Sequence, residues 1–295
     1  MKTLYFAPIN LYGNKAYRQL LLNHEADYVF TELIMCDRLE KEIKQGKLEE
    51  ISKKTIVQIG ANTKEQIIEV LNQIISNEVN LNLGCPHSSY KKRMICSGIL
   101  YDIKFLDKIT KTFSDECKKY DKIPSVKIRI GIDPEKIEIE KYLKILEKNN
   151  IKKVYIHART LRHPYTKPVE KKVLFGLKKK FPNLNLVYNG DIDSYEKYLE
   201  VEPYFEGVMI GRAALSNPLI FKQIKKKEKN QKINDYEHFV NNPNIKIIDG
   251  KMFHSREKKQ LIREFETIAK KLKLSKKQID ANLKYLNKGI TKTRS

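Results

Sequence analysis

The chain has 295 residues, of which 32% are charged and 41% are apolar, so its composition is that of a folded globular protein. It carries 58 Lys and Arg against 36 Asp and Glu, a formal net charge of +22. The excess is concentrated near the end, where residues 221–295 hold 21 basic and 8 acidic residues. This charge predicts a polyanion such as RNA or DNA as partner, although a generally lysine-rich proteome gives the same composition.

The sequence lacks the patterns that are typical of membrane-spanning, secreted and metal-binding proteins. No apolar run approaches the roughly 18 residues of a membrane-spanning helix, and the first residues lack the pattern of a signal peptide. The cysteines, which are Cys36, Cys85, Cys96 and Cys117, form no CxxC pair and have no ligand-like spacing. We therefore expect a monomer in the reducing cytoplasm, with no disulfide, no metal ion and no membrane partner.

Short β-rich runs alternate with helix-like segments along residues 1–213. The runs that predict strands are Leu4–Ile9, Tyr28–Leu33, Thr55–Gly60, Val79–Leu83, Ser125–Ile130, Val154–His157, Leu184–Tyr188 and Val208–Ile210. Between them, the apolar spacing predicts helices over residues 63–75, 102–120 and 134–149, the first capped by Thr63 and the last started by Pro134. This alternation predicts an α/β fold, the (β/α)8 TIM barrel, in which eight parallel strands close into a ring.

The glycine spacing argues against the main competing fold. No two glycines are separated by a single residue, so the G-x-G-x-x-G fingerprint is absent, and the P-loop pattern is absent too. An open-sheet dinucleotide-binding fold is therefore disfavoured.

The end of the chain has a different character. Residues 257–272 and 275–286 predict amphipathic helices, and a run of lysines precedes them. We therefore divide the chain into a barrel over residues 1–224 and a small, basic, all-helical domain over residues 225–295.

Polar residues gather where the predicted strands end. The groups are Gln58, Asn82–Pro86, Lys127–Arg129, His157–Thr160, Asn189–Asp191 and Gly211–Arg212. Each has an ordinary structural explanation on its own, such as a turn glycine or a buried histidine. In this fold, however, the carboxyl ends of all strands meet on one rim, where catalytic residues lie. Their joint placement therefore predicts an active site.

The residue types at this rim indicate its chemistry. Glycines after the seventh and eighth strands let backbone N–H groups approach an anion, which predicts a phosphorylated cofactor. The residues concerned are Asn189, Gly190, Gly211 and Arg212. Lys127 is expected to place positive charge beside an electron-rich ring. Cys85 is either a buried structural thiol or a reactive one, and its position at a strand end favours the reactive role.

Five motifs occur in a fixed order along the barrel. They are N-x-G-C-P at residues 82–86, K-I-R-x-G at 127–131, H-x-R-T at 157–160, N-G-D at 189–191 and M-I-G-R at 209–212. With Ala7–Ile9, Thr31–Leu33 and Gln58–Gly60, this order resembles that of the tRNA-dihydrouridine synthases. The resemblance covers the whole barrel and implies an FMN-binding (β/α)8 barrel followed by a small helical RNA-binding domain.

The resemblance also implies a two-stage reaction with assigned residues. NADPH, or NADH, reduces FMN, and the flavin then delivers a hydride to C6 of a uracil ring in tRNA while Cys85 gives a proton to C5. The implied FMN contacts are Pro8, Ile9, Gln58, Lys127, His157, Asn189, Gly190, Asp191, Gly211 and Arg212. The implied contacts with uracil or nearby RNA are Asn82, Lys127, Arg129 and Arg159.

The chain departs from the family pattern in places. Ile9 replaces the usual methionine, and the loop at residues 93–98 is not glycine-rich. Two other functions stay open: an FMN-dependent dehydrogenase of a free pyrimidine, and a non-catalytic RNA-binding barrel. The basic tail argues against the first, and the intact set of Cys85, Lys127 and His157 argues against the second.

Overall fold

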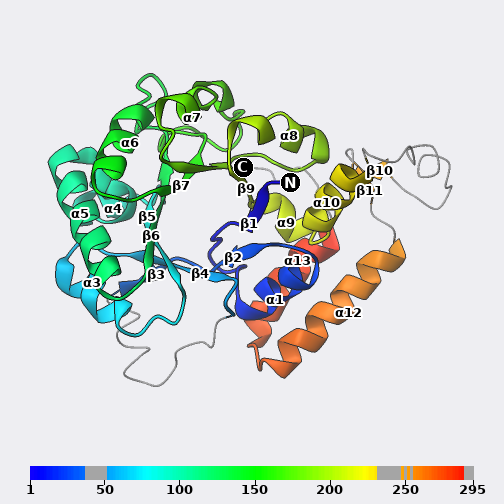
Figure 1. Ribbon diagram of the computed structural model, residues 1–295. Helices are drawn as coiled ribbons and strands as arrows, with labels where there is room; N and C mark the ends of the chain where they lie inside the picture. The colour runs from blue at the N-terminus through cyan, green and yellow to red at the C-terminus, as the bar shows by residue number, and fades with distance from the viewer. Residues whose placement is uncertain (37–51, 231–246, 249–250, 253–254, 289–295) are drawn as a thin grey trace.

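The computed structural model describes residues 1–36, 52–230, 247–248, 251–252 and 255–288 (Figure 1). Eight parallel strands close into a ring, which confirms the (β/α)8 barrel. The strands are β1 (Thr3–Phe6), β2 (Tyr28–Phe30), β4 (Thr55–Gly60), β5 (Glu78–Leu83), β6 (Ile123–Arg129), β7 (Lys153–His157), β8 (Asn185–Asn189) and β9 (Gly207–Ile210). The pairing of β1 with both β2 and β9, and of β2 with β4, completes the ring.

The second predicted strand is broken in the structure. β2 pairs with the start of β4, and a separate short strand, β3 (Ile34–Met35), pairs with its end. Between them, the backbone N–H of Thr31 donates to the carbonyl of Ile56, and the Thr31 hydroxyl accepts from the N–H of Gln58 at 3.0 Å. A side chain thus takes the place of a ladder acceptor, so the expected strand Tyr28–Leu33 ends early.

Helices cover the outside of the ring, those from α1 to α8 between successive strands and the others after β9 (Figure 1). They are α1 (Lys15–Asn23), α3 (Lys64–Leu71), α4 (Ser89–Arg93), α5 (Ile103–Lys119), α6 (Ile139–Lys148), α7 (Leu177–Lys180), α8 (Tyr195–Leu199), α9 (Arg212–Ser216), α10 (Ile220–Asn230), α12 (Ser255–Lys271) and α13 (Lys276–Lys288). Thr63 caps α3 as predicted, because its side chain accepts from the N–H of Gln66. Within the described ranges, no helix has the length and apolar character needed to cross a membrane.

The helix expected over residues 134–149 starts later than predicted. α6 begins at Ile139, and Pro134 lies in the loop before it. The cause is a tertiary contact: the backbone N–H of Glu138 donates to the carbonyl of Ile130 at 2.8 Å, which folds this loop back on the end of β6. That pairing overrides the local preference of proline for a helix start.

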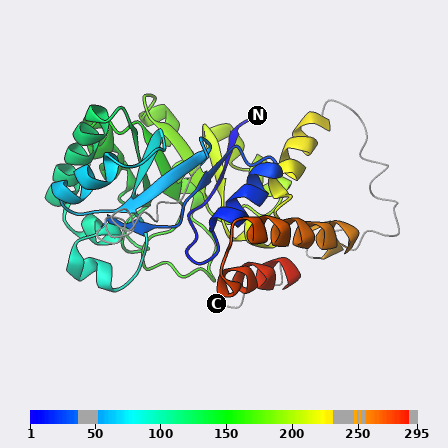
Figure 2. The same ribbon diagram turned by 90° about the horizontal axis from the view of Figure 1, so that it is seen from below.

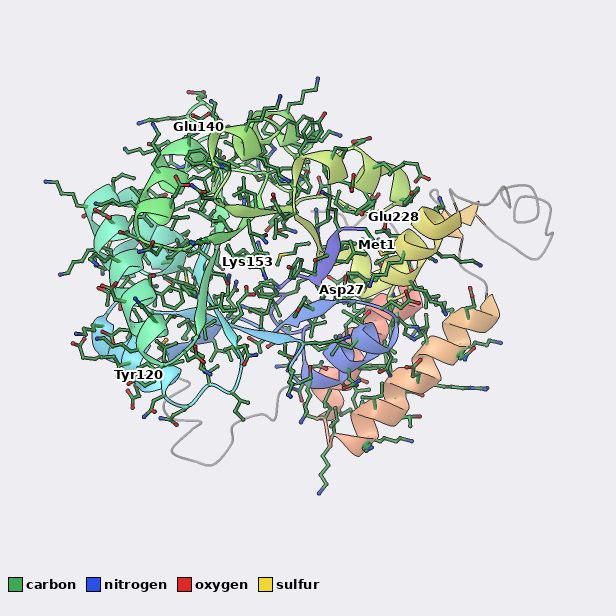
Figure 3. All side chains as sticks on the ribbon, viewed as in Figure 1. Met1, Asp27, Tyr120, Glu140, Lys153 and Glu228 are labelled. Atoms are coloured by element: carbon green, nitrogen blue, oxygen red, sulfur yellow. The ribbon has the colours of Figure 1, made fainter. Side chains whose placement is uncertain are left out.

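A buried polar cluster closes the amino-terminal end of the barrel. The Glu78 carboxylate accepts from Lys153 Nζ at 2.7 Å and from the Tyr155 hydroxyl at 2.8 Å. Lys153 lies near the centre of the ring in Figure 3, over the faces of Tyr5 and Tyr28. Burial alone would lower the pKa of Lys153, but Glu78 raises it above its usual value, so the ammonium stays charged. The opposite end of the barrel is the one left for ligands.

The C-terminal helices pack against the barrel wall (Figure 2). α12 lies beside α1, where the rings of Phe265 and Tyr17 are 5.8 Å apart and Glu264 pairs with His24 at 2.9 Å. α13 reaches the loop between β1 and α1 through Asn282. One hydrophobic core therefore continues from the barrel into these helices.

The division of the chain at residue 224 stays a prediction. α10 runs through that position, and Ile224 is buried in the barrel core. Between α10 and α12 the structure adds a short hairpin, β10 (Ile247–Ile248) and β11 (Lys251–Met252), to the expected helices.

Candidate active site

Residues from adjacent strands meet at the carboxyl end of the barrel. In the sheet register, Asn82 on β5 lies beside Lys127 on β6. Arg129, two residues later on β6, lies beside His157 on β7, which in turn lies beside Asn189 on β8. Four neighbouring strands therefore bring their predicted site residues to one rim.

A chain of side-chain amides supports this rim from below. Gln58 accepts from Asn82 Nδ2 and donates to Asn80 Oδ1, both at 2.8 Å. The Asn82 Oδ1 atom accepts from the N–H groups of Gly84 at 3.0 Å and Cys85 at 2.9 Å. Asn82 therefore fixes the turn that carries the cysteine, and Gln58 is fully buried beneath it.

The Cys85 thiol is partly buried at this turn. The groups that favour its ionised form include the backbone N–H of His87 and the side chain of Tyr90. Burial raises its pKa, and the His87 bond and the cations Lys127 and Arg129 offset this effect only in part. The thiol therefore keeps its proton at neutral pH, which is the form that a proton donor needs.

The other three cysteines are buried. Cys96 has no exposed surface and begins a short 3-10 helix, Cys96–Tyr101, with a left-handed backbone, φ 50°. Burial, with Cys85 and Cys36 nearby, raises its pKa strongly. Burial also raises the pKa of Cys117, to about 12. Of the four cysteines, Cys85 alone is partly accessible at the rim.

Lys127 is a cation without an anionic partner among the described residues. Burial and the neighbouring Arg129 lower its pKa to about 7. The one group that acts in the other direction is Cys85, which raises the pKa only when it is ionised. A ligand that places a negative charge or a hydrogen-bond acceptor here would therefore be stabilised.

His157 is buried beside these cations. Burial, followed by the positive charges of Lys127, Arg129 and two further arginines, holds the pKa of His157 well below its usual value. The imidazole is therefore neutral at neutral pH. Its ring stacks on Tyr165, with the ring centroids 5.9 Å apart.

Asp191 links the loops that follow β7, β8 and β9. Its carboxylate accepts from Arg159 at 3.0 and 2.6 Å and from Arg212 at 2.9 Å. Arg159 is buried and also donates to the carbonyl of Lys167 at 2.7 Å. Asp191 has φ 48° and Gly190 has φ 150°, so both lie in backbone regions that most residues avoid. Two guanidinium groups thus hold a strained turn and leave one net positive charge there.

Arg129 holds a second set of loops together. Its guanidinium donates to the carbonyl of Gly84 at 3.0 Å, to the carbonyl of Thr160 at 2.7 Å and to the Tyr165 hydroxyl at 2.8 Å. Arg129 and Arg159 are both buried by such contacts. Their expected contacts with RNA stay predictions.

Tyr165 is the site residue that the sequence did not single out. It is 49% exposed, and three guanidinium groups surround its ring within 5.4 Å: those of Arg129, Arg159 and Arg212. An aromatic residue in a loop after a barrel strand was the signal available. Its contacts could not be predicted from the sequence, because they depend on arginines at or just after the ends of three different strands.

The turns after β8 and β9 offer backbone donors. The N–H groups of Gly190, Gly211 and Arg212 donate to no acceptor among the described residues. A Cβ atom added at Gly211 would meet only the side chains of Ala7 and Ile9, at 3.7 and 3.8 Å, so the space before this backbone is open. Donors in this arrangement, with a guanidinium beside them, suit a phosphate group.

The segment after β1 borders the same turns. Ala7 donates its backbone N–H to the carbonyl of Ile210 at 2.9 Å, which sets Pro8 and Ile9 beside the end of β9. The structure thus brings the expected cofactor residues of β1, β6, β7, β8 and β9 to one rim, whereas Gln58 lies below it in the amide chain.

Comparison with known proteins relates this order of motifs to one family. The family model for dihydrouridine synthases matches residues 5–294. A probable tRNA-dihydrouridine synthase of Aquifex aeolicus is 28% identical over 235 residues, which is 75% of this chain and 72% of that protein. One of Helicobacter pylori is 30% identical over 234 residues, covering 76% and 70%. A tRNA-dihydrouridine(20a/20b) synthase of Schizosaccharomyces pombe, with NAD(P)+ in its name, is 27% identical over 229 residues, covering 73% and 67%.

Alkylation should distinguish the cysteines. We expect iodoacetamide to modify Cys85 of the native protein first, and more slowly at pH 7 than a free thiol, because the raised pKa leaves little thiolate. The rate should rise as the pH increases beyond 8.5, the usual thiol pKa. Peptide mapping by mass spectrometry at several times checks this. Equal labelling of Cys96 and Cys85 in the folded protein would contradict the assignment.

Proposed function

The chain belongs to the dihydrouridine synthase family, and from this premise we propose how its rim carries out the reaction. The activity is the reduction of the C5=C6 bond of specific uridines in tRNA, with NAD(P)H as reductant. The observation that carries the proposal is that the ends of β5 and β6 bring the partly accessible thiol of Cys85 and the amine of Lys127, which has no anionic partner among the described residues, to the same rim.

The rim residues fit FMN as the cofactor. Its phosphate would lie against the free N–H groups of Gly190 and Gly211 and the guanidinium of Arg212. Its ring carries acceptors, and Lys127 and the neutral His157 are suited to bond with them. When bound, FMN supplies the hydride that it has received from NAD(P)H. A bound acceptor would stabilise the ammonium form of Lys127, because it would raise the pKa of Lys127 from about 7.

Cys85 completes the reduction on the uracil ring. Hydride reaches C6, and the thiol gives its proton to C5, so the C5=C6 double bond becomes a single bond and a thiolate remains. Water returns a proton to that thiolate. Asn82 positions the donor, because its Oδ1 atom holds the backbone N–H of Cys85 at 2.9 Å. Burial keeps the proton on sulfur until the ring arrives.

The C-terminal helices supply the polyanion contact. Within the described part of α12 and α13 and the turn between them, the exposed lysines are Lys259, Lys270, Lys271, Lys273, Lys276, Lys277 and Lys284. Such side chains bind phosphates without reading sequence. We assign tRNA binding mainly to this surface, that is, to the basic region 225–295 expected from the sequence, with Arg129, Arg159 and Tyr165 nearer the reacting base.

A dehydrogenase of a free pyrimidine is the weaker alternative. The family match extends to residue 294 and so includes the basic helices, which a small substrate does not need. A non-catalytic RNA-binding barrel is weaker still, because Cys85, Lys127 and His157 are all in place.

The Cys85→Ser variant tests the proton donor. It should keep its flavin, its tRNA affinity and its reduction by NADPH, since the substitution is nearly isosteric. Dihydrouridine formation should fall by about 100-fold or more, the scale of general acid catalysis, because a hydroxyl is a far weaker acid than a thiol. Stopped-flow absorbance and mass spectrometry of tRNA nucleosides measure the two half-reactions.

Two matched variants control for thiol loss. Cys96→Ser and Cys117→Ser should form dihydrouridine at near-normal rates, because both thiols are fully buried and present no surface to a substrate. An undiminished rate in Cys85→Ser at neutral pH would refute the donor assignment and make Cys96, on the same loop, the next candidate.

Arg212→Ala tests the phosphate site. Loss of one charged donor should weaken FMN binding about tenfold, and Arg159 should still hold Asp191 in place. Quenching of flavin fluorescence on titration gives the affinity. Arg162→Ala is the matched control, because Arg162 is also an exposed arginine paired with an aspartate, Asp133, but lies in the loop after β7. Equal FMN affinities for the two variants would contradict the assignment.

Charge removal on α13 tests the RNA surface. A variant with Lys276, Lys277 and Lys284 all changed to Gln should bind tRNA more weakly, and the slope of log affinity against log salt should fall by about one per lost phosphate contact. The control carries the same change at Lys104, Lys108 and Lys144, which are exposed on α5 and α6 across the barrel (Figure 1). Similar losses in both variants would mean that only net charge matters.

A further inference from the structure

The turn between β1 and α1 presents an apolar side chain at the rim. Leu11 is 65% exposed, and its backbone lies in the left-handed region with φ 70°. The turn is tightly closed, because the N–H groups of Tyr12 and Gly13 both donate to the carbonyl of Ile9, at 3.3 and 2.9 Å. Asn10 fixes it further by accepting from the N–H of Leu33 at 3.2 Å.

The left-handed backbone and the exposed side chain of Leu11 lower the free energy of unfolding of the unbound protein, and burial of that side chain does not compensate for this. A left-handed backbone is unfavourable for a residue with a branched side chain and is readily adopted by glycine or asparagine. Cys96 is also left-handed, but its side chain is fully buried and contributes packing. Leu11 is neither glycine nor asparagine, and its side chain is not buried. A strained backbone that holds an apolar group in solvent points to a bound partner.

The position of Leu11 indicates which partner. On one side Ile9 adjoins Gly211 at the proposed phosphate site. On the other side Tyr12 packs on Tyr285 of α13, with ring centroids 4.7 Å apart, and Asn282 donates to the Tyr12 carbonyl at 2.8 Å. Leu11 therefore lies at the seam between the catalytic rim and the basic C-terminal helices. A polyanion bound to those helices has to cross this seam to deliver a base to Cys85.

A uridine that is brought to Cys85 leaves a gap in the base stack of the RNA. A uridine within folded tRNA is stacked, and an enzyme reaches its ring only after taking it out of the stack. Proteins that open base steps hold them apart with inserted apolar side chains. We propose that Leu11 is such a wedge: its side chain lies against the base next to the target uridine in the bound tRNA and fills the space that the uridine has left. This role rests on the tRNA-reducing activity described above and adds a positioning residue to it.

Two substitutions separate a wedge from a structural role. Leu11→Gly and Leu11→Asn both fit the left-handed backbone and remove the apolar group. Each should unfold at an equal or higher urea concentration than the unaltered protein and should keep its rate of flavin reduction by NADPH. The kcat/KM for tRNA should fall about tenfold, equivalent to about 1.4 kcal/mol. Leu11→Met should restore most of the activity, because it returns an apolar side chain.

A matched control and a direct readout complete the experiment. Ile75→Ala removes another exposed apolar side chain, 75% exposed, from the amino-terminal end of the barrel, and should leave kcat/KM unchanged. With 2-aminopurine beside the mapped target uridine, binding of the unaltered protein should raise fluorescence, and binding of Leu11→Gly should raise it less. Normal kcat/KM in both Leu11 variants, or an equal fluorescence rise, would overturn the wedge. Absence of dihydrouridine formation by the unaltered protein would instead count against the activity itself.

Discussion

The carboxylate of Asp191, held between the guanidinium groups of Arg159 and Arg212, is the interaction on which the catalytic rim depends. It joins loops from three consecutive strands at a residue whose backbone is left-handed. Breaking the pair with Arg159 would leave a buried cation uncompensated, at a cost of roughly 3–5 kcal/mol. The turn that carries the free N–H group of Gly190 therefore has a fixed conformation before a ligand binds, as electrostatic preorganisation requires.

The charges left over at the rim explain how it handles protons. Four basic side chains and one carboxylate lie together, so the field is positive and favours anionic ligands, which is consistent with the proposed phosphorylated cofactor and RNA. The same burial that lowers the pKa of Lys127 to about 7 and that of His157 well below its usual value raises that of Cys85. Each of these three groups is thus shifted towards its neutral form. A neutral thiol retains its proton for transfer, and a partly charged Lys127 becomes fully charged only when an acceptor is bound.

Much of the fold and the site could be predicted because both depend on patterns along the chain. Strand and helix periodicity indicated the barrel, and parallel closure then placed Cys85, Lys127 and His157 on one rim whatever the details. The failures have a different origin. The helix start at Pro134 and the continuity of the second strand were wrong because single tertiary hydrogen bonds, from Glu138 and from Thr31, overrode local preference. Tyr165 was missed because the three arginines around its ring lie at or just after the ends of three strands. No residue spacing within one segment indicates such an arrangement.

The continuous core limits how far the C-terminal helices can move relative to the barrel. Phe265 of α12 packs on Tyr17 of α1, and Asn282 of α13 bonds both to the Asn14 side chain and to the Tyr12 backbone. Movement of the basic helices towards the rim would therefore break buried contacts with the barrel. If tRNA binds to these helices as proposed, deformation of the RNA avoids breaking those contacts. On this proposal, phosphate contacts on the helices and apolar contact with Leu11 at the seam offset the cost of unstacking the uridine.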